Sequence, residues 1–416
     1  MTSEPTPNYQ PRHIPYPRVT AIVAILLTGA NLRTAITALS PLLPTIQEKL
    51  GVGGTLIGVL GTVPTAMFAT SAFILPRLKE KMTLSQLMLF ALALTTAGQL
   101  LRVAYPFPWL LLAGSIVALA AIGILNSAMP LVAREYFPRH ISGVSIAYML
   151  SSQAVLACAP VIALPLLRWA EQRGWPGWQV SLGSWAALSL VAALSWLPLL
   201  IRRGPRPVDT APEPNLRRPV WRTKVGLGLA FMFGSNSLVA YTLMTFLPQI
   251  FVEAGASTTF AAGALSIWTM IGVPITFLGP WIVGRFSQVF PVVALAAASF
   301  TASMLGLAFI PLGTAGMPWL RWVWVLLSAS GTIVFPMAMV LVNVRARTLD
   351  GATLLTSFGQ GVGYTVASVG PLLTGALFEA TGSFRLPLAL LSGFGLITFV
   401  AGYFATRRVY VEDQLP

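Results

Sequence analysis

The stretch GANLRTAITALSPLLP, residues 29–44, is an apolar segment with a single arginine, Arg33, inside it. Residues 19–43 contain no other charged side chain, so Arg33 falls near the middle of a segment long enough to cross a bilayer. Placing an arginine at the centre of a membrane helix costs about 2.5–3.5 kcal/mol on insertion scales. A charge kept at that cost indicates a functional role, and the remaining sequence has to show which one.

The composition is that of a polytopic membrane protein. Of 416 residues, 56% are hydrophobic and 9% are charged, and the mean hydropathy is +0.76. A soluble protein carries roughly 25% charged residues, so this chain could not cover its surface in water. The net charge of +14 lies in short stretches between apolar runs, which excludes a nucleic-acid-binding face. Cys158 is the single cysteine and lies in an apolar run, so we expect no disulfide, metal or cofactor.

Twelve segments match the length of a membrane span, about 20 apolar residues. Together they predict an all-α integral membrane protein with twelve transmembrane helices. In the first half the expected spans are residues 18–44, 54–76, 83–104, 107–133, 141–167 and 179–201. In the second half they are residues 224–250, 258–283, 290–311, 319–343, 352–378 and 386–406.

The distribution of Lys and Arg predicts the orientation. With both termini inside, nineteen of the 26 basic residues lie on the cytoplasmic side, six lie outside, and Arg33 is the remaining one. Cytoplasmic loops are enriched in Lys and Arg, so we expect both termini in the cytoplasm. Arg102, Tyr105 and Trp109 then fall at the outer interface, where a snorkelling arginine and an aromatic belt are the expected roles.

The chain is doubled. LPTIQEKLGVGGT from Leu43 and LPQIFVEAGASTT from Leu247 match at a constant shift of 204 residues, which also pairs Pro76 with Pro280. Repeats of the same topology are typical of transporters built from two parallel halves. We therefore predict two pseudo-symmetric six-helix bundles, residues 18–201 and 224–406. A cytoplasmic linker (202–223) joins them, and cytoplasmic tails (1–17 and 407–416) flank them.

This organisation resembles the major facilitator superfamily. The superfamily's loop signature after span 2 is eroded here. AFILPRLKEK keeps Arg77 and Lys81 but has Pro76 in place of the acid, and GPWIVGRF keeps Gly279 and Arg285 in the second half. The resemblance implies that Arg77, Lys81 and Arg285 belong to the gating loops, while the missing acid argues against the usual salt-bridge latch.

The closer resemblance is to the cyanate and nitroimidazole transporter family within that superfamily. It rests on NLRTAITALSPLLP in span 1, GQLLR at the end of span 3, GILNSAMP in span 4, GWQVSLGSWAALSLVAALSWLP in span 6 and YTLMTFLPQI in span 7. The resemblance covers the whole chain and implies transport of small solutes, anionic in one member and neutral nitroaromatic in another.

No predicted span carries a carboxylate or histidine at mid-depth, so Arg33 has no expected counter-ion in the protein. A guanidinium suits planar anions because it offers five donors in a fixed fork. Its helical neighbour Thr37 lies at i+4. The alternative is that Arg33 ties span 1 to a neighbouring helix through an amide or carbonyl oxygen. Other mid-depth side chains are weaker candidates, either for substrate contact or as helix packing: Asn126, Gln153, Asn236, Tyr241, Trp268, Gln360 and Tyr364.

We therefore expect a transporter rather than an enzyme: a secondary-active or facilitative carrier of a small monoanionic solute that works by alternating access, with Arg33 binding the anion. The alternative is an exporter of small neutral nitroaromatic compounds. Because no span carries a titratable acid, we expect uniport, exchange, or entry of a proton on the substrate. The expected partners are a small-molecule substrate and membrane lipid, without nucleic acid. The expected form is a monomer in a bacterial inner membrane.

Overall fold

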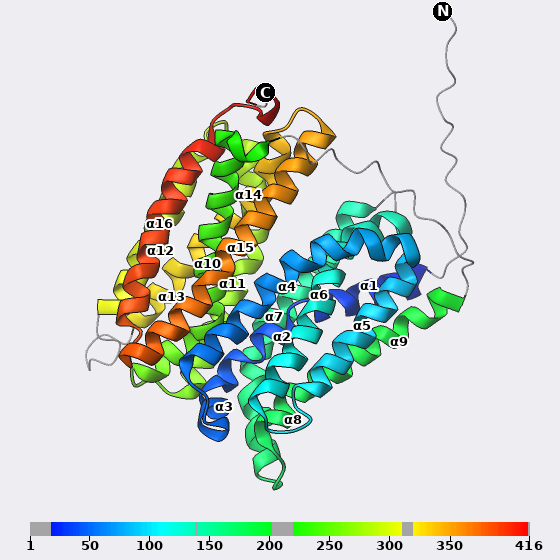
Figure 1. Ribbon diagram of the computed structural model, residues 1–416, viewed down its shortest axis with the longest axis vertical. Coiled ribbons are helices and arrows are strands. Elements are labelled where there is room, and N and C mark those ends of the chain that lie inside the picture. Colours follow the sequence, from blue (N-terminus) through cyan, green and yellow to red (C-terminus); the bar gives the residue numbers. More distant parts are fainter. Residues whose placement is uncertain (1–17, 138–139, 202–218, 310–318, 415–416) are drawn as a thin grey trace, which may run out of the picture.

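The computed structural model describes residues 18–137, 140–201, 219–309 and 319–414, and the described elements are helical (Figure 1). The predicted tail at residues 1–17 and residues 202–218 of the predicted linker lie outside this description. Twelve helices or helix groups among the described residues are long and apolar enough to cross a membrane. This confirms the predicted all-α membrane fold with twelve spans.

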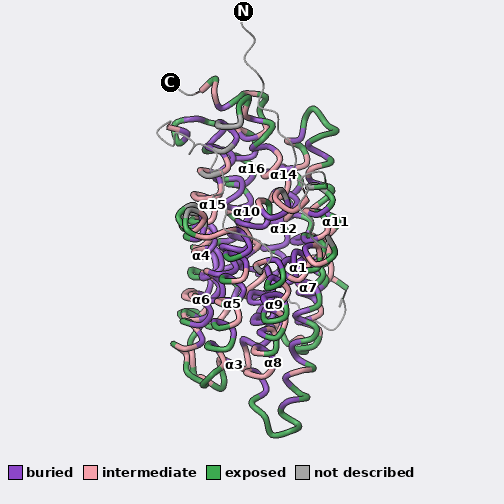
Figure 2. Tube along the Cα trace, turned by 90° about the vertical axis from the view of Figure 1, so that its right-hand side faces the viewer, coloured by how far each residue is buried: buried purple, intermediate pink, exposed green. Residues whose placement is uncertain are grey.

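The first six spans consist of nine α-helices and one 3-10 helix. Their bounds are α1 (Arg18–Asn31), α2 (Thr34–Thr37), η1 (Ser40–Leu42), α3 (Leu43–Leu50), α4 (Gly54–Lys81), α5 (Leu84–Leu101), α6 (Pro108–Tyr136), α7 (Ile141–Glu171), α8 (Gly177–Gly183) and α9 (Trp185–Ile201). Buried residues follow the sides of these helices that face one another, while many outward positions stay exposed, as expected for surfaces that meet lipid (Figure 2).

The second six spans consist of seven α-helices, with a 3-10 helix before the first and another after the last. Their bounds are η2 (Val220–Arg222), α10 (Lys224–Glu253), α11 (Thr258–Arg285), α12 (Phe290–Phe309), α13 (Leu320–Gly331), α14 (Val334–Val344), α15 (Leu349–Thr381), α16 (Arg385–Thr406) and η3 (Val411–Asp413). Side-chain oxygens cap several helix N-termini: Thr223 accepts from Gly226 N, Ser257 from Phe260 N, and Thr348 from Gly351 N.

The internal repeat is visible in backbone geometry. Gly51 ends α3 at φ +63°, and Gly255, 204 residues later, follows α10 at φ +80°. Gly174 and Gly382 form a second pair, after the fifth and eleventh spans, at φ +75° and +67°. Left-handed backbone favours glycine because it has no Cβ. The same turn chemistry therefore recurs at equivalent places in both halves.

The first span differs from the single helix expected over residues 18–44. It is interrupted at Leu32 and Arg33, and α2 lasts only one turn. Pro41 and Pro44 have no N–H to give to Thr37 and Ser40, which breaks the helix again beyond α2. The hydroxyl of Thr34 donates to Asn31 O at 3.1 Å across the first break. The interruption frees backbone carbonyls at mid-membrane depth.

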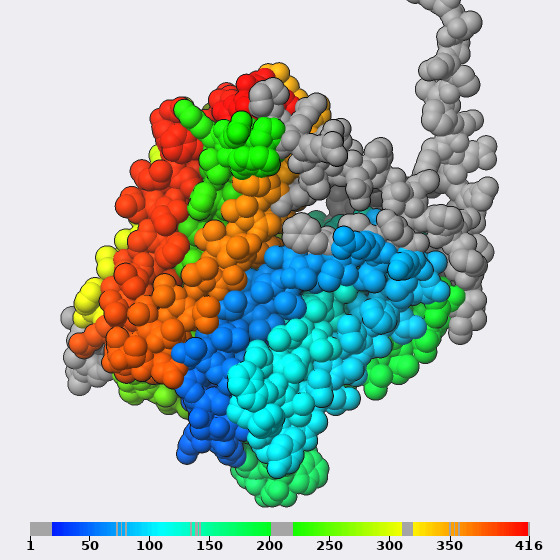
Figure 3. Space-filling model, viewed as in Figure 1, coloured from blue at the N-terminus to red at the C-terminus, as the bar shows by residue number. Residues whose placement is uncertain are grey.

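The two halves meet at one end of the molecule and separate toward the other (Figures 1 and 3). We call the end with the start of α1 and the end of α16 the tail end, and the end with α3 and α8 the loop end. At the tail end the hydrophobic core consists of two separate clusters, one of residues 21–199 and one of residues 220–411. Toward the loop end single clusters join both halves, with Leu42 and Ile46 packing beside Phe246 and Phe251. The structure is therefore closed at the loop end.

Helices α4 and α15 form the tightest part of that closure. A Cβ on Gly375 would lie 2.8 Å from the Cα of Gly58, and a Cβ on Gly58 would lie 2.6 Å from Pro371 O. Small residues let the two backbones approach closely, as at many membrane helix interfaces. At the end of this contact the Glu379 carboxylate accepts from Thr55 N at 2.7 Å and caps α4. In Figure 3, α15 lies along α4 near the loop end, and the two diverge toward the tail end.

The C-terminal segment packs on the second half. The Glu412 carboxylate accepts from the backbone N–H groups of Arg347 and Thr348 at 3.0 Å, and Arg347 pairs with Asp413 at 2.9 Å. Partial burial alone would raise the pKa of Glu412, but these hydrogen bonds outweigh it and hold the pKa below its usual value. The segment thus fixes the loop between α14 and α15.

Gly375→Ala should weaken the closed loop end, because the added methyl group cannot fit against α4. Gly361→Ala on the same helix is the control, since a Cβ there meets nothing within 4 Å. Spin labels on the exposed positions 77 and 285 would report the separation of the halves at the tail end by pulsed electron resonance. We expect Gly375→Ala to shift the distance distribution to shorter values and Gly361→Ala to leave it unchanged. Identical distributions would show that this contact does not hold the conformation.

Candidate functional site

Arg33 lies at the break in the first span and reaches into the other half of the protein. Its backbone is neither helical nor extended, at φ −128° and ψ −10°. The guanidinium Nη1 donates to the hydroxyl of Tyr241 on α10 at 3.2 Å, and Cζ lies 5.9 Å from the ring centre of Phe68 on α4. The residue is partly exposed, whereas Leu32 and Thr34 beside it are buried. Among the described residues, neither a backbone carbonyl nor a carboxylate accepts a hydrogen bond from the guanidinium.

Aromatic rings gather around this arginine. Tyr364 on α15 meets Tyr241, Phe68 and Phe233 edge-on, with ring centres 6.5, 6.0 and 5.1 Å apart. Phe233 also packs against Phe335 on α14 at 5.3 Å. We call Phe68, Phe233, Tyr241, Phe335 and Tyr364 the aromatic group. It draws on α4 of the first half and on α10, α14 and α15 of the second.

Three predicted amide side chains are partly exposed, as the lining of an accessible space would be. Gln153 on α7 points toward α11, where its Nε2 lies 3.3 Å from the place of a Cβ on Gly272. Gln360 on α15 donates to Met339 Sδ at 3.4 Å, a weak acceptor that a better one could replace. Asn126 on α6 has a side-chain nitrogen without a hydrogen-bond partner among the described residues.

Other predicted residues make buried contacts instead. Thr37 is fully buried, and its hydroxyl donates to Arg33 O at 3.3 Å. Asn236 is fully buried and donates to Gly331 O at 2.8 Å, at the break between α13 and α14. Trp268 is 4% exposed within the core that joins the halves. The structure therefore brings Tyr241 and Tyr364 to Arg33, and it places Thr37, Asn236 and Trp268 in the packing around the breaks and the core.

The charge of Arg33 has no carboxylate partner among the described residues. The described acidic residues near the spans stand at helix ends: Glu171 pairs with Lys49 at 2.7 Å, and Glu379 caps α4. In the described part of the chain no group of three or more His, Cys, Asp or Glu could hold a metal ion. The site therefore presents one positive charge, neutral hydrogen-bonding groups and aromatic rings.

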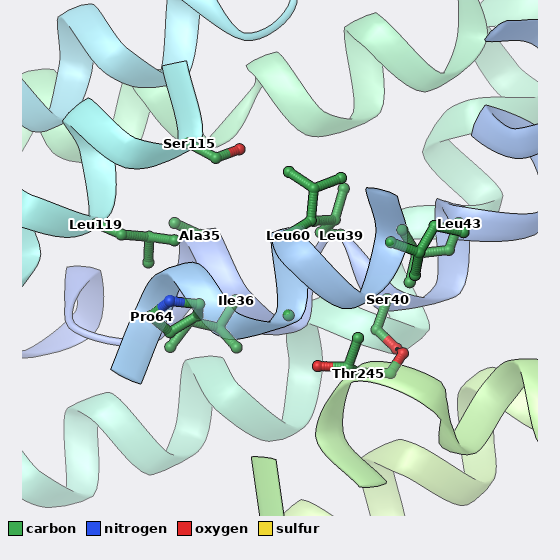
Figure 4. A pocket seen from close by; sticks show the side chains of 12 residues that line it. Ala35, Ile36, Leu39, Ser40, Leu43, Leu60, Pro64, Ser115, Leu119 and Thr245 are labelled. Carbon is green, nitrogen blue, oxygen red and sulfur yellow. Dashed lines mark hydrogen bonds between the residues drawn. The ribbon is translucent and has the colours of Figure 1, made fainter. Parts of the chain in front are cut away.

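A small cavity of about 20 Å³ lies between the break and the loop end (Figure 4). Its polar lining consists of Ser40, Ser115 and Thr245, whose hydroxyls donate to backbone carbonyls at 2.7 to 2.9 Å. A cavity needs about 10–15 Å³ to hold one water molecule, so this space cannot accommodate an organic solute. Arg33 itself is partly exposed, on the tail-end side of this cavity.

The predicted loop residues Arg77, Lys81 and Arg285 are exposed, and none of them forms an ion pair with another described residue. The prediction for Arg102 is wrong. Instead of snorkelling at the interface, Arg102 is fully buried and donates from Nη1 to Ala35 O at 3.1 Å. The close approach of α5 and α6 at Gly98 and Gly114 buries it, which apolar patterning along the chain does not reveal.

Sequence reasoning also missed Phe68, Phe233 and Phe335. Each is one phenylalanine among many in apolar spans, and an aromatic residue in a span is usually packing. The available signal was position: Phe68 lies on span 2, which itself forms part of the closure, and Phe233 lies on span 7, the equivalent of the interrupted first span.

The sequence matches the Major Facilitator Superfamily over residues 25–368. The chain belongs to this superfamily. It is 26% identical over 391 residues to the 2-nitroimidazole transporter of Escherichia coli K12, covering 94% of this chain and 96% of that protein. It is 24% identical over 378 residues to the cyanate transport protein CynX of the same organism, covering 88% and 92%. These matches confirm the resemblance expected from the sequence.

The fold matches a solved transporter structure as well. A bacterial homologue of the human lysosomal transporter Spinster, in an inward-facing and occupied conformation, superimposes with a TM-score of 0.77 at 14% identity, over 96% of this chain and 99% of that one. Together with the family match, this makes the chain a multi-pass membrane transport protein of the major facilitator type, for a small-molecule substrate, and not an enzyme.

Tyr241→Phe should destabilise the protein, because it removes the hydrogen-bond acceptor of Arg33 and keeps the ring. A hydrogen bond to a charged group contributes about 1.5–3 kcal/mol, so the unfolding temperature in detergent should fall. Tyr403→Phe is the matched control, since Arg407 donates to the Tyr403 hydroxyl at an exposed site, where such pairs contribute about 0–1 kcal/mol. Equal unfolding temperatures for both variants would mean that the Arg33–Tyr241 contact stabilises nothing.

Proposed function

We propose that this protein is a secondary-active or facilitative transporter of a small monoanionic solute, such as cyanate or a small organic anion. Arg33 provides the positive charge of its binding site. The proposal rests on the surroundings of the Arg33 side chain. The residue is partly exposed, and its guanidinium donates from the first half to a neutral hydroxyl on the second half. The name of the similar CynX protein adds support.

Transport proceeds by alternating access in this proposal. The two six-helix halves rock about the site, which faces first one side of the membrane and then the other. A ligand shifts such an equilibrium only through contacts that differ between the two states. Arg33 and Tyr241 lie on opposite halves, so an anion that draws the guanidinium away from the hydroxyl changes a contact between the halves. Gln153 and Gln360 are partly exposed and would supply neutral hydrogen bonds, together with Asn126, whose buried side-chain nitrogen has no partner among the described residues. The buried side chains of Thr37, Asn236 and Trp268 would position the site.

A second candidate is export of small neutral nitroaromatic compounds. The aromatic group around Arg33 favours it, because flat rings stack on aromatic side chains and a nitro oxygen accepts from a guanidinium. The similar 2-nitroimidazole transporter points the same way. For either substrate we place the protein in a bacterial inner membrane as a monomer, with both termini cytoplasmic and Arg77, Lys81 and Arg285 in the gating loops.

Uptake of labelled cyanate into proteoliposomes tests the anion proposal. Arg33→Gln should lower kcat/KM about 100-fold, because about 2.7 kcal/mol of charge-assisted binding is lost and each tenfold is about 1.4 kcal/mol. Arg173→Gln is the control, since Arg173 is exposed at the far end of α7 and stacks on Trp169. Unchanged, saturable uptake by Arg33→Gln would remove this residue from the mechanism. Strong competition by neutral 2-nitroimidazole together with none by small anions would favour the second candidate.

Cyanate uptake should depend on an imposed pH gradient only through the protonated fraction of the substrate. The described spans hold no carboxylate or histidine at mid-depth that could carry a proton across. Transport rates measured at equal substrate concentration, with and without an inward proton gradient, check this. A severalfold acceleration by the gradient, beyond the change in the protonated fraction of the substrate, would reveal a proton site on the protein.

A further inference from the structure

Arg102 is fully buried, and the one hydrogen bond that its side chain makes with the described residues goes to the interrupted first span. It follows α5 and is 0% exposed, and Nη1 donates to Ala35 O at 3.1 Å. Ala35 lies in α2, two residues beyond Arg33. The contact therefore joins α5 to the one-turn helix that carries Arg33 at its start.

The Ala35 carbonyl is available to Arg102 because α2 is so short. Within the described backbone the Thr34 carbonyl still accepts from Ala38 N at 3.2 Å, but no backbone N–H donates to Ala35 O. Pro41 prevents the helix from continuing in register. A carbonyl left free at mid-membrane depth needs a donor, and Arg102 supplies it.

Several polar atoms beside this hydrogen bond have no partner of their own among the described residues. Nε and Nη2 of Arg102 and both amide atoms of Gln99, one turn earlier, are buried without a partner among the described residues. Each of these atoms exposes less than 1 Å² to a water-sized probe, so no space for a bound water or ion lies beside them. An unsatisfied buried donor costs about 1–3 kcal/mol. This argues against a ligand site here and for a role of the one bond that Arg102 does make.

That bond is held in place by close packing. A Cβ on Gly114 of α6 would lie 2.6 Å from the Cβ of Arg102, and a Cβ on Gly98 would lie 2.9 Å from Gly114 O. The two glycines let α5 pack closely against α6. The side chain of Arg102 extends toward α2, where it reaches Ala35 O. On the other side of the break, Asn31 is fixed by Ser189 at 2.6 Å. Residues 32–34 are thus anchored from both ends.

We propose that Arg102 is a positioning residue for Arg33. By holding the Ala35 carbonyl, it fixes the break in the first span in the orientation that turns the Arg33 side chain toward Tyr241. The importance of this orientation for transport rests on the proposed function. The positioning itself does not, and it can be tested separately.

The direct test is the accessibility of position 33. In a Cys158→Ser background, which removes the single native cysteine, Arg33→Cys introduces a label site that a cationic thiol reagent can reach through the open tail end. Adding Arg102→Gln should lower the labelling rate at least fivefold, and Arg102→Lys, which keeps one charged donor, should restore it to within twofold. Gln99→Leu is the matched control, because it changes a buried polar group on the same helix without touching Ala35.

A second variant perturbs the same contact from the other side. Pro41→Ala restores the N–H that a continuing helix gives to Thr37 O and removes the ring that stops the helix. Leu39 N can then reach the Ala35 carbonyl, so labelling at position 33 should slow although Arg102 is intact. If Arg102→Gln fails to fold, this variant and Arg102→Lys still decide the question. Labelling that stays within twofold in Arg102→Gln, or in Pro41→Ala where Arg102→Gln does not fold, would overturn the proposal.

Cyanate uptake separates this inference from the proposed function. With the native Arg33, Arg102→Gln should raise KM at least tenfold with kcat within threefold, and in the Arg33→Gln background it should add less than twofold. If Arg33→Gln leaves KM unchanged while labelling at position 33 still depends on Arg102, the anion proposal fails and the positioning role stands. Equal increases of KM in both backgrounds would show that Arg102 affects substrate binding by a route other than Arg33.

Discussion

The Arg33 guanidinium lies within a membrane span, and no carboxylate among the described residues neutralises it. Arg33 is held by a neutral hydroxyl at 3.2 Å and the face of a phenylalanine ring at 5.9 Å, and neither cancels a full charge. Charges at mid-membrane are costly unless they meet water, a partner or a ligand. The break in the first span, the aromatic group and the separation of the halves at the tail end all leave this group accessible while it stays bonded.

The two ends of the molecule have opposite packing, and Arg33 lies at the boundary between them. Toward the loop end, backbone-to-backbone contact through Gly58 and Gly375 leaves no room for a side chain, let alone a solute. Toward the tail end, each half has its own hydrophobic core. Packed interfaces of this kind switch between discrete arrangements and do not deform gradually. A charge at the boundary, bonded across it, is well placed to respond to which end is closed.

The sequence was sufficient for what depends on composition and period. Twelve apolar spans and the repeat that pairs Gly51 with Gly255 could both be predicted from it. Side-chain partners could not, because they depend on how helices face one another. Asn236 looked like a candidate for the site by depth alone, yet its amide satisfies the carbonyl that the break at Gly331 frees. Arg102 looked interfacial by its place at the end of a span, yet two glycines bury it. A break in a helix leaves backbone carbonyls without their usual N–H donors. The order of residues along the chain does not show which side chain supplies the missing hydrogen bond.

The need for hydrogen-bond donors at helix breaks explains why two arginines and two asparagines lie at or against interrupted helices. Arg102 and Asn236 donate to the carbonyls freed at the breaks, and Asn31 anchors the end of α1 to α9. Of these four residues, only Arg33 directs its side chain across the boundary between the halves. The side chains around Arg33 are mostly uncharged aromatic rings. They therefore compensate little of the free energy needed to dehydrate an ion. Multiply charged or strongly hydrated ions are disfavoured by such a site, while a flat solute with one delocalised charge, or a polar neutral ring, gives up less hydration on entering it. Under the proposed function, the weak solvation that aromatic rings give around a single fixed cation is therefore what would exclude hard ions.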